Sequence, residues 1–357
     1  MERLVQTQWG RFWRLSWPAL PGLLLVTGCS RVPPGVKFEV LADGSPPVVW
    51  PQAPEPTRIR YLASFAEPAD IGVRRSFLRK VIDVLFGGSQ GPRLGRPYGL
   101  AVDGSGRIYV ADPDQSGIHL FDPGQGRHKF VNKSEGQRFR SPIGVATDGQ
   151  GGIFVSDSDL GMIFALDEDW KERFRIEQDL ERPTGLAFHQ THELLYVVDT
   201  HAHTVRVYHR DGQPAFSFGH RGTGDGELNF PTAITIGSDG NIYLSDSMNF
   251  RVQVFTPDGQ FLSGFGRHGD AVGDLARPKG IATDSMGHIY VVEGLFDVVN
   301  IYNQEGRLLL TFGGGGRGPG QFWLATGLAI DSQNRIYVAD SFNRRVQVFQ
   351  YLPGPTP

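Results

Sequence analysis

Six short apolar runs along the chain each end in an acidic residue. They are Ile108–Asp112, Ile153–Asp157, Leu195–Asp199, Ile242–Asp246, Ile289–Glu293 and Ile336–Asp340. Successive acidic positions are 45, 42, 47, 47 and 47 residues apart. A second apolar run precedes each of them, as Pro97–Asp103 precedes the first, and a turn such as Asp103–Gly106 joins the pair. Because Asp and Gly suit tight β-hairpins, each repeat is predicted to begin with a hairpin.

Two further strands complete each repeat. A loop follows the acidic residue and leads to an alternating run such as Val252–Phe255 or Val346–Phe349, and a turn then leads to a fourth run such as Phe261–Gly266. Four strands in a repeat of about 45 residues are typical of a β-propeller blade. The chain is therefore predicted to be all-β, a six-bladed β-propeller of four-stranded antiparallel blades.

The sixth repeat stops one strand short, after residues 346–351. Residues 58–65, near the other end of the chain, alternate as a half-buried strand does, with Ile59, Tyr61 and Ala63 on one side. We expect this N-terminal strand to complete the last blade. It would cover an otherwise bare sheet edge and close the ring without a disulfide.

The N-terminal segment has the order of a bacterial signal peptide. Residues 1–28 are first net positive and then mostly apolar, and the apolar part is too short to span a bilayer. Val26–Cys29 resembles a lipobox, with Val26 in place of the usual leucine, which implies that Cys29 is acylated. Ser30, by the same resemblance, favours the outer membrane. An ordinary cleaved signal peptide and a buried N-terminal segment are the alternatives.

The chain thus divides into four expected parts. They are a signal peptide over 1–28, a Pro-rich linker over 29–57, the propeller over 58–352 and a tail over 353–357. Apolar residues at helical spacing predict one short helix near 73–86. This helix either caps one face of the ring or, because it carries basic residues, contacts anionic lipid or a partner.

Blades four and six resemble the NHL repeat. The resemblance rests on Asp246–Phe255 and Asp340–Phe349, and on the Gly-rich connectors Phe265–Asp270 and Phe312–Gly318. It extends over about residues 96–352, although in the other four blades the loop after the acidic residue lacks the Asn and Arg. It implies a structural role for the acidic residues, which would bind loop backbone and pair with an arginine such as Arg251 or Arg345.

Charge and cysteine content argue against nucleic-acid binding, an internal disulfide and a Cys-based zinc site. The formal net charge is -3, and removal of residues 1–28, with three arginines and one glutamate, leaves 32 basic and 37 acidic residues, a net of -5. A general nucleic-acid binder needs a basic surplus, so nucleic acid is not an expected partner. Cys29 is the only cysteine, which excludes an internal disulfide and a Cys-based zinc site.

The loops between second and third strands are the predicted binding surface, because in propellers they lie on one face near the channel mouth. Their sequences differ from blade to blade, as those of a specific binding surface would. The candidate binding residues are Asp114, Gln115, Asp159, His201, His203, Met248, Asn249, Phe296, Asp297, Phe342, Asn343 and Arg344. No catalytic residue is identified among them.

His201 and His203 are the one pair with metal-like spacing. A closed zinc site needs about four ligands and a catalytic one three, and nothing local supplies the others. Solvated loop residues are therefore the favoured interpretation, and a divalent metal is the weaker one. The Gly-rich connectors lack the Gly-Lys-Ser/Thr and the helix of a phosphate-binding loop. No cofactor is predicted.

Two classes of function follow. The favoured hypothesis is a non-enzymatic binding or scaffolding lipoprotein of the bacterial cell envelope, a monomeric propeller outside the cytoplasm that is held to the membrane through Cys29. It would present its loops to a protein, peptide or envelope polymer. The alternative is a metal-dependent lyase or lactonase with its site at the channel mouth, since related six-bladed propellers host such chemistry. No set of metal ligands transfers position by position, which ranks the enzyme second.

Overall fold

The computed structural model describes residues 46–71 and 93–354. The chain divides into two units, and the second, Pro34–Pro357, contains every described residue. Cys29 and the helix expected near 73–86 lie outside the described residues. No helix within the described ranges is long and apolar enough to cross a lipid bilayer.

The first three blades are four-stranded antiparallel sheets, with strands given from the inside outward. Blade 1 comprises β3 (Leu100–Val102), β4 (Ile108–Asp112), β5 (Gly117–Asp122) and β6 (Arg127–Val131). Blade 2 comprises β9 (Pro142–Thr147), β10 (Ile153–Asp157), β11 (Met162–Leu166) and β12 (Glu172–Ile176). Blade 3 comprises β13 (Pro183–His189), β14 (Leu194–Asp199), β15 (Thr204–His209) and β16 (Pro214–Phe218). A small hairpin, β7 (Lys133–Ser134) and β8 (Gln137–Arg138), lies between blades 1 and 2 in the chain.

The last three blades follow the same plan. Blade 4 comprises β17 (Pro231–Ile236), β18 (Ile242–Asp246), β19 (Arg251–Phe255) and β20 (Phe261–Phe265), with a 3-10 turn η2 (Ser247–Asn249). Blade 5 comprises β21 (Pro278–Thr283), β22 (Ile289–Glu293), β23 (Val298–Tyr302) and β24 (Leu308–Gly313). Blade 6 comprises β25 (Ala325–Ile330), β26 (Arg335–Asp340) and β27 (Arg345–Tyr351), joined by β2 (Ile59–Phe65) and β1 (Val49–Trp50), while η1 (Pro68–Ile71) follows β2.

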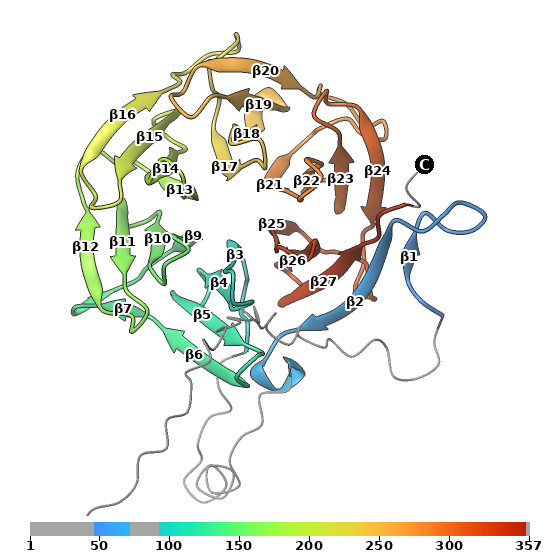
Figure 1. The fold of residues 1–357 in the computed structure, drawn as a ribbon, viewed down its shortest axis with the longest axis horizontal. Helices are drawn as coiled ribbons and strands as arrows, with labels where there is room; N and C mark the ends of the chain where they lie inside the picture. The colour runs from blue at the N-terminus through green and yellow to red at the C-terminus, as the bar shows by residue number, and fades with distance from the viewer. Residues whose placement is uncertain (1–45, 72–92, 355–357) are drawn as a thin grey trace, which may run out of the picture. The chain divides into compact units, whose positions relative to one another are not determined.

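The six sheets are arranged in a ring (Figure 1). Their inner strands touch in a closed circle, from β3 through β9, β13, β17, β21 and β25 back to β3. The second strands are buried along their whole length or nearly so, whereas the outer strands are partly exposed. This difference explains why the second strands read as continuous apolar runs. The predicted six-bladed all-β propeller is confirmed.

Glycine lets the inner strands approach one another closely. A Cβ on Gly99 would lie 2.2 Å from the carbonyl oxygen of Ile143 in the next blade, and one on Gly144 would lie 2.1 Å from that of Thr184. Both distances are well inside van der Waals contact, so a side chain at these positions would push neighbouring blades apart. The narrow channel therefore depends on these glycines.

The ring closes through an N-terminal strand, as predicted. β2 pairs antiparallel with β27, with Ile59 opposite Tyr351 and Phe65 opposite Val346. Ile59 and Phe65 are 0% and 1% exposed. Phe65 packs edge-on against Phe121 of blade 1 at 4.9 Å between ring centres, so this strand supplies contacts to the first blade as well as to the last.

A β-bulge in the closing strand changes which side chains share a face. The register shifts between Tyr61 and Ala63, so Ile59 and Tyr61 pack toward blade 5 while Leu62 and Phe65 pack toward blade 1. The expectation that Ala63 faces the same side as Ile59 and Tyr61 is therefore wrong. A strict period of two breaks at the inserted residue.

Residues 48–50, within the expected linker, also join this blade. β1 pairs with β2, and Trp50 lies 5.8 Å from Phe312 and 5.9 Å from Phe349 between ring centres. The contact with Phe312 ties β1 to blade 5 as well as to blade 6.

The acidic residue that ends each second strand is buried and holds the connector entering its own blade. In all six blades its carboxylate accepts at least one N–H bond from the connector backbone 16 to 18 residues earlier in the chain, as Asp340 accepts the N–H of Trp323 at 2.8 Å. All six are 0% exposed: Asp112, Asp157, Asp199, Asp246, Glu293 and Asp340. We call these residues the anchor carboxylates. The structural role expected for them is confirmed.

In the NHL-like blades each anchor carboxylate also gathers polar side chains. Asp246 accepts bonds from Asn249 (2.8 Å), Arg251 (2.9 Å) and Gln253 (3.0 Å). The same guanidinium donates to the connector carbonyls of Gly224 and Glu227. The loop after the strand and the connector before the blade are thus joined through one buried charge.

Removal of the closing strand should open the ring. A chain without residues 1–66 loses a seven-residue strand whose ladder bonds contribute about 1 kcal/mol each. It also loses the burial of Ile59, Tyr61 and Phe65, each worth roughly 1.5–3 kcal/mol. A chain without residues 1–45 retains every described residue. The chain without residues 1–66 should unfold at a markedly lower temperature and self-associate through the bare β27 edge. The chain without residues 1–45 should keep nearly the melting temperature and association state of the full chain. Equal melting temperatures and solution masses for both would contradict the closure.

Candidate functional site

The loop face of the propeller is the face formed by the loops between second and third strands and by the connectors between blades. These segments are hydrogen-bonded to each other. The Met248 amide donates to the Asn229 carbonyl at 3.0 Å, and the Phe342 amide donates to the Trp323 carbonyl at 3.1 Å. All the loop residues predicted from the sequence lie in these loops.

The predicted residues fall into two groups. Those with exposed side chains are Asp114, Asp159, His201, Met248, Phe296, Phe342 and Arg344. Those whose side chains bond within the protein are Gln115, His203, Asn249, Asp297 and Asn343. The second group builds the loop face, and the first is available to a partner.

His203 and Asp297 illustrate the second group, because each ties its own blade to the next. Nδ1 of His203 accepts the N–H of Phe230 at 3.1 Å, and Oδ1 of Asp297 accepts the N–H of Leu324 at 2.7 Å. Burial raises the pKa of Asp297, against the lowering effect of its backbone bonds. Both side chains occupy equivalent loop positions with positive φ, 54° and 55°.

Large apolar side chains are exposed on the loop face of three successive blades, 4 to 6. They are Phe230, Met248, Leu295, Phe296, Trp323 and Phe342, between 36% and 58% exposed. We call them the apolar patch. The rings of Trp323 and Phe342 meet edge-on at 5.6 Å. Clustered exposed apolar side chains mark interaction sites more often than scattered ones.

Half of the apolar patch was not among the residues predicted from the sequence. Leu295 stands beside the predicted Phe296, whereas Phe230 and Trp323 belong to connectors between blades, in which no binding residue was predicted. Their one sequence signal is an aromatic residue just before an inner strand, as Phe230 stands directly before Pro231.

A hollow of about 610 Å³ lies next to the apolar patch, where blade 6 meets blade 1. It is lined by Gly95, Arg96, Asp114, Arg317, Trp323, Ser341, Phe342, Asn343, Arg344 and Arg345. The guanidinium of Arg317 lies over the Trp323 ring, 4.9 Å from its centre, a cation–π arrangement. Aromatic surface and exposed arginine therefore adjoin in one concave region.

The channel itself is small, with an internal volume of about 70 Å³. Equivalent inner-strand residues line it: Tyr98, Ile143, Thr184, Thr232, Lys279 and Thr326. Blade 5 is the exception in charge, because it places Lys279 where three other blades have threonine. The ammonium of Lys279 lies 5.7 Å from the centre of the Tyr98 ring. Burial, with the charges of Arg277 and Arg96, lowers the pKa of Lys279 to about 8.

Three exposed arginines stand at equivalent positions, one residue before the inner strand motif of blades 1, 3 and 5. They are Arg96, Arg182 and Arg277. Their backbone N–H groups are held by the anchor carboxylates, at 2.9 Å for Arg96, 2.8 Å for Arg182 and 2.8 Å for Arg277. The backbone of each arginine is fixed while its side chain stays accessible.

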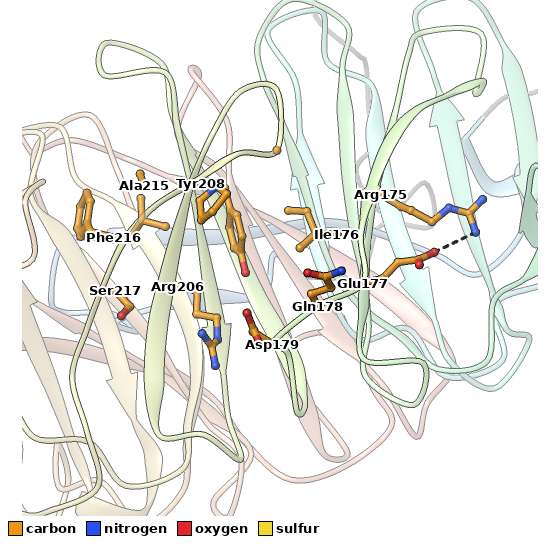
Figure 2. A pocket seen from close by; sticks show the side chains of 13 residues that line it. Arg175, Ile176, Glu177, Gln178, Asp179, Arg206, Tyr208, Ala215, Phe216 and Ser217 are labelled. Carbon is orange, nitrogen blue, oxygen red and sulfur yellow. Dashed lines mark ion pairs between the residues drawn. The ribbon is translucent and has the colours of Figure 1, made fainter.

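A second hollow, of about 590 Å³, opens between the outer parts of blades 2 and 3 (Figure 2). The connector between these blades spans only residues 177–182, whereas residues 219–230 join blades 3 and 4. In the longer connector Leu228 is fully buried between the blades, but Leu180 in the short one stays partly exposed. The short connector thus leaves this gap unfilled.

The two arginines that line the second hollow are already paired. Arg175 pairs with Glu172 and, as Figure 2 shows, with Glu177, and Arg206 lies 3.4 Å from the anchor carboxylate of Asp199. Arg206 thereby replaces the glutamine of the NHL-like blades. Since the short connector accounts for this hollow, we place the candidate site on the loop face.

The histidine pair does not form a metal site by itself. Nδ1 of His203 is occupied by the Phe230 N–H, and His201 is exposed. Within residues 46–71 and 93–354, no three His, Cys, Asp or Glu side chains are grouped so that they could hold a metal ion. A zinc centre needs three or four convergent ligands, so these residues do not fit one.

Family comparisons agree with the repeat pattern. A model described as "SMP-30/Gluconolactonase/LRE-like region" matches residues 141–262, and one described as "NHL repeat" matches residues 322–349. No curated protein sequence matches this one.

Solved structures share the fold at low sequence identity. A streptogramin B lyase is 12% identical with a TM-score of 0.57, over 73% of this chain and 95% of that one. Virginiamycin B lyase from Staphylococcus aureus is 13% identical with a TM-score of 0.55, over 72% and 96%. A chain of a nidogen/laminin complex is 18% identical with a TM-score of 0.53, over 69% and 86%.

Such identities establish the fold alone, and the fold serves both lyases and binding proteins. Together with the six sheets and the closing strand, the two family matches identify this chain as a six-bladed β-propeller of the SGL/NHL type.

Proposed function

We propose that this chain is a non-enzymatic binding module of the bacterial cell envelope, whose loop face holds a protein, peptide or envelope polymer. The observation that carries the proposal is the apolar patch, together with the hollow beside it. Aromatic residues and arginine are enriched at the energetic centres of interfaces. Trp323 and Phe342 line the hollow and belong to the patch, which makes them the expected anchors.

The arginines beside these anchors suit a partner with acidic or polar groups. Arg96, Arg317 and Arg344 line the same hollow against one carboxylate, that of Asp114. Charges at the rim of an interface chiefly steer association and set orientation. The aromatic pair would supply most of the binding free energy, and the arginines would select the partner.

The alternative of a metal-dependent lyase or lactonase has weaker support. The structural relatives include lyases, but at these identities that likeness concerns only the fold. His201 is the exposed member of the histidine pair on the loop face. His203 already accepts a backbone N–H from the connector that enters blade 4. No observation in the described part of the chain favours catalysis over binding.

The membrane anchor is a separate part of the proposal. It rests on the lipobox-like Val26–Cys29 after a signal-peptide-like segment. Acyl chains on the cysteine would anchor the protein durably, since each buried methylene contributes about 0.8 kcal/mol. The Pro-rich segment that follows would separate the propeller from the lipid surface.

Replacement of Cys29 tests the anchor. Cys29→Ala should abolish acylation and move the protein from the membrane to a soluble extracytoplasmic fraction. Fractionation of cells and the intact mass of the purified chain measure both effects. An unchanged membrane fraction, without an acyl mass in the original protein, would refute the anchor and leave the binding proposal standing.

Loss of the aromatic anchors tests the binding face. Trp323→Ala with Phe342→Ala should weaken partner binding by about 2 kcal/mol or more, roughly thirtyfold in Kd. The partner is first captured from detergent-solubilised membranes with the original protein, and its affinity for each variant is then measured.

A matched control uses exposed leucines away from the loop face. Leu262 and Leu309, on outer strands β20 and β24, are 49% and 51% exposed, so Leu262→Ala with Leu309→Ala removes similar apolar surface. The control should bind normally, and both variants should keep their stability within about 0.5 kcal/mol. Equal losses in both variants, or none in the aromatic one, would rule out the apolar patch as the binding surface.

A further inference from the structure

The three arginines of blades 1, 3 and 5 stand at the channel mouth, because each lies two residues before a residue that lines the channel, Tyr98, Thr184 or Lys279. The charges of Arg182, Arg96 and Arg277 all act on the phenol of Tyr98, whose pKa burial nevertheless raises. Arg277 and Arg96 also act on Lys279. Residues from three alternate blades therefore produce one positive field on the ring axis.

Within the described residues no ion pair joins Arg96, Arg182 or Arg277 to a carboxylate, unlike Arg251 and Arg345, which pair with their anchor carboxylates. Exposed cations that stand together without acidic partners are suited to bind an anion.

Lys279 adds a fourth cation, and blade 5 is altered to accommodate it. Where blades 2, 3, 4 and 6 have Ser or Thr after the anchor carboxylate, blade 5 has Gly294. A Cβ on Gly294 would lie 2.9 Å from Cδ of Lys279, so glycine makes room for the lysine stem. Two departures from the repeat, Lys279 and Gly294, thus coincide at one place.

The two carboxylates that act on Lys279 are committed elsewhere. Glu293 accepts the N–H groups of Ala276, Arg277 and Leu295, and Asp297 accepts that of Leu324. They lower the free-energy cost of burying the ammonium group of Lys279 without forming an ion pair with it. The site therefore retains positive charge for a ligand.

The channel limits how such a ligand can bind. An internal volume of about 70 Å³ holds only a few water molecules, each of which takes up about 30 Å³ in the liquid. A polymer cannot thread the ring, so an anionic group would dock on the mouth from the loop face.

We propose that the channel mouth binds a compact, multiply charged oxyanion group carried by the partner, either a phosphate or clustered carboxylates. Arg96, Arg182 and Arg277 would donate from the rim, and Lys279 from below. This inference rests on the proposed function, since it names the chemistry that the partner presents on the ring axis while the apolar patch holds its adjoining part.

Binding of small anions to the purified full chain in detergent tests the site. Titration calorimetry with pyrophosphate and with citrate should show one saturable site, and the tighter of the two identifies phosphate or carboxylate as the source. Arg182→Gln and Lys279→Met should each weaken binding about tenfold, as expected for lost charge-assisted hydrogen bonds. Gly294→Ser, which restores the residue of other blades and keeps every charge, should weaken it about threefold or more by displacing the lysine.

The control is Lys171→Gln, an exposed lysine between the outer strands of blade 2, which should bind as the original does. No saturable binding of either anion, or an equal loss with Lys171→Gln, would overturn the proposal. Arg182 is exposed, so its variant is expected to fold even if Lys279→Met does not. Because these probes contain no aromatic or polymeric part, their failure would leave the test of Trp323 and Phe342 independent.

Discussion

One buried carboxylate per blade determines the geometry of the loop face. Each accepts backbone N–H groups from the connector that enters its blade, and these bonds to a charged acceptor are stronger than neutral ones. Because the bonds involve backbone, the connectors can differ in length and side chains without losing their position. Six equivalent anchors can therefore support a surface whose chemistry differs around the ring.

The candidate site uses this freedom. At equivalent connector positions the chain places Arg96, Arg182 and Arg277 in alternate blades and Phe230 in blade 4, so basic and aromatic side chains divide the face between them. Blade 5 departs furthest from the repeat, with Lys279 on the channel and Gly294 beside it. The blade repeat explains why the ring forms. The residues that depart from the repeat mark where the loop face and the channel lose their six-fold symmetry.

The repeat period, the anchor carboxylates and the closing strand were predictable because each depends on local periodicity or on one unpaired strand. The bulge between Tyr61 and Ala63 was not, since nothing in an alternating sequence marks an inserted residue. Asn249 and Asn343 matched the pattern of a loop surface but bond the anchors instead. The basic channel mouth was missed because its arginines are 86 and 95 residues apart, as 182 − 96 and 277 − 182 give, and meet only after ring closure.

Amide hydrogen exchange tests most directly whether the anchor carboxylates position the mouth. Although Arg96, Arg182 and Arg277 are exposed, their amides should be strongly protected in the original protein. In Glu293→Ala, which removes the side chain that accepts both N–H groups, exchange at Ala276 and Arg277 should accelerate by about tenfold or more, as expected for a lost hydrogen bond to a charged group, while Arg96 and Arg182 stay protected. Rapid exchange at all three arginines in the original protein, or no change at Arg277 in the variant, would contradict the account.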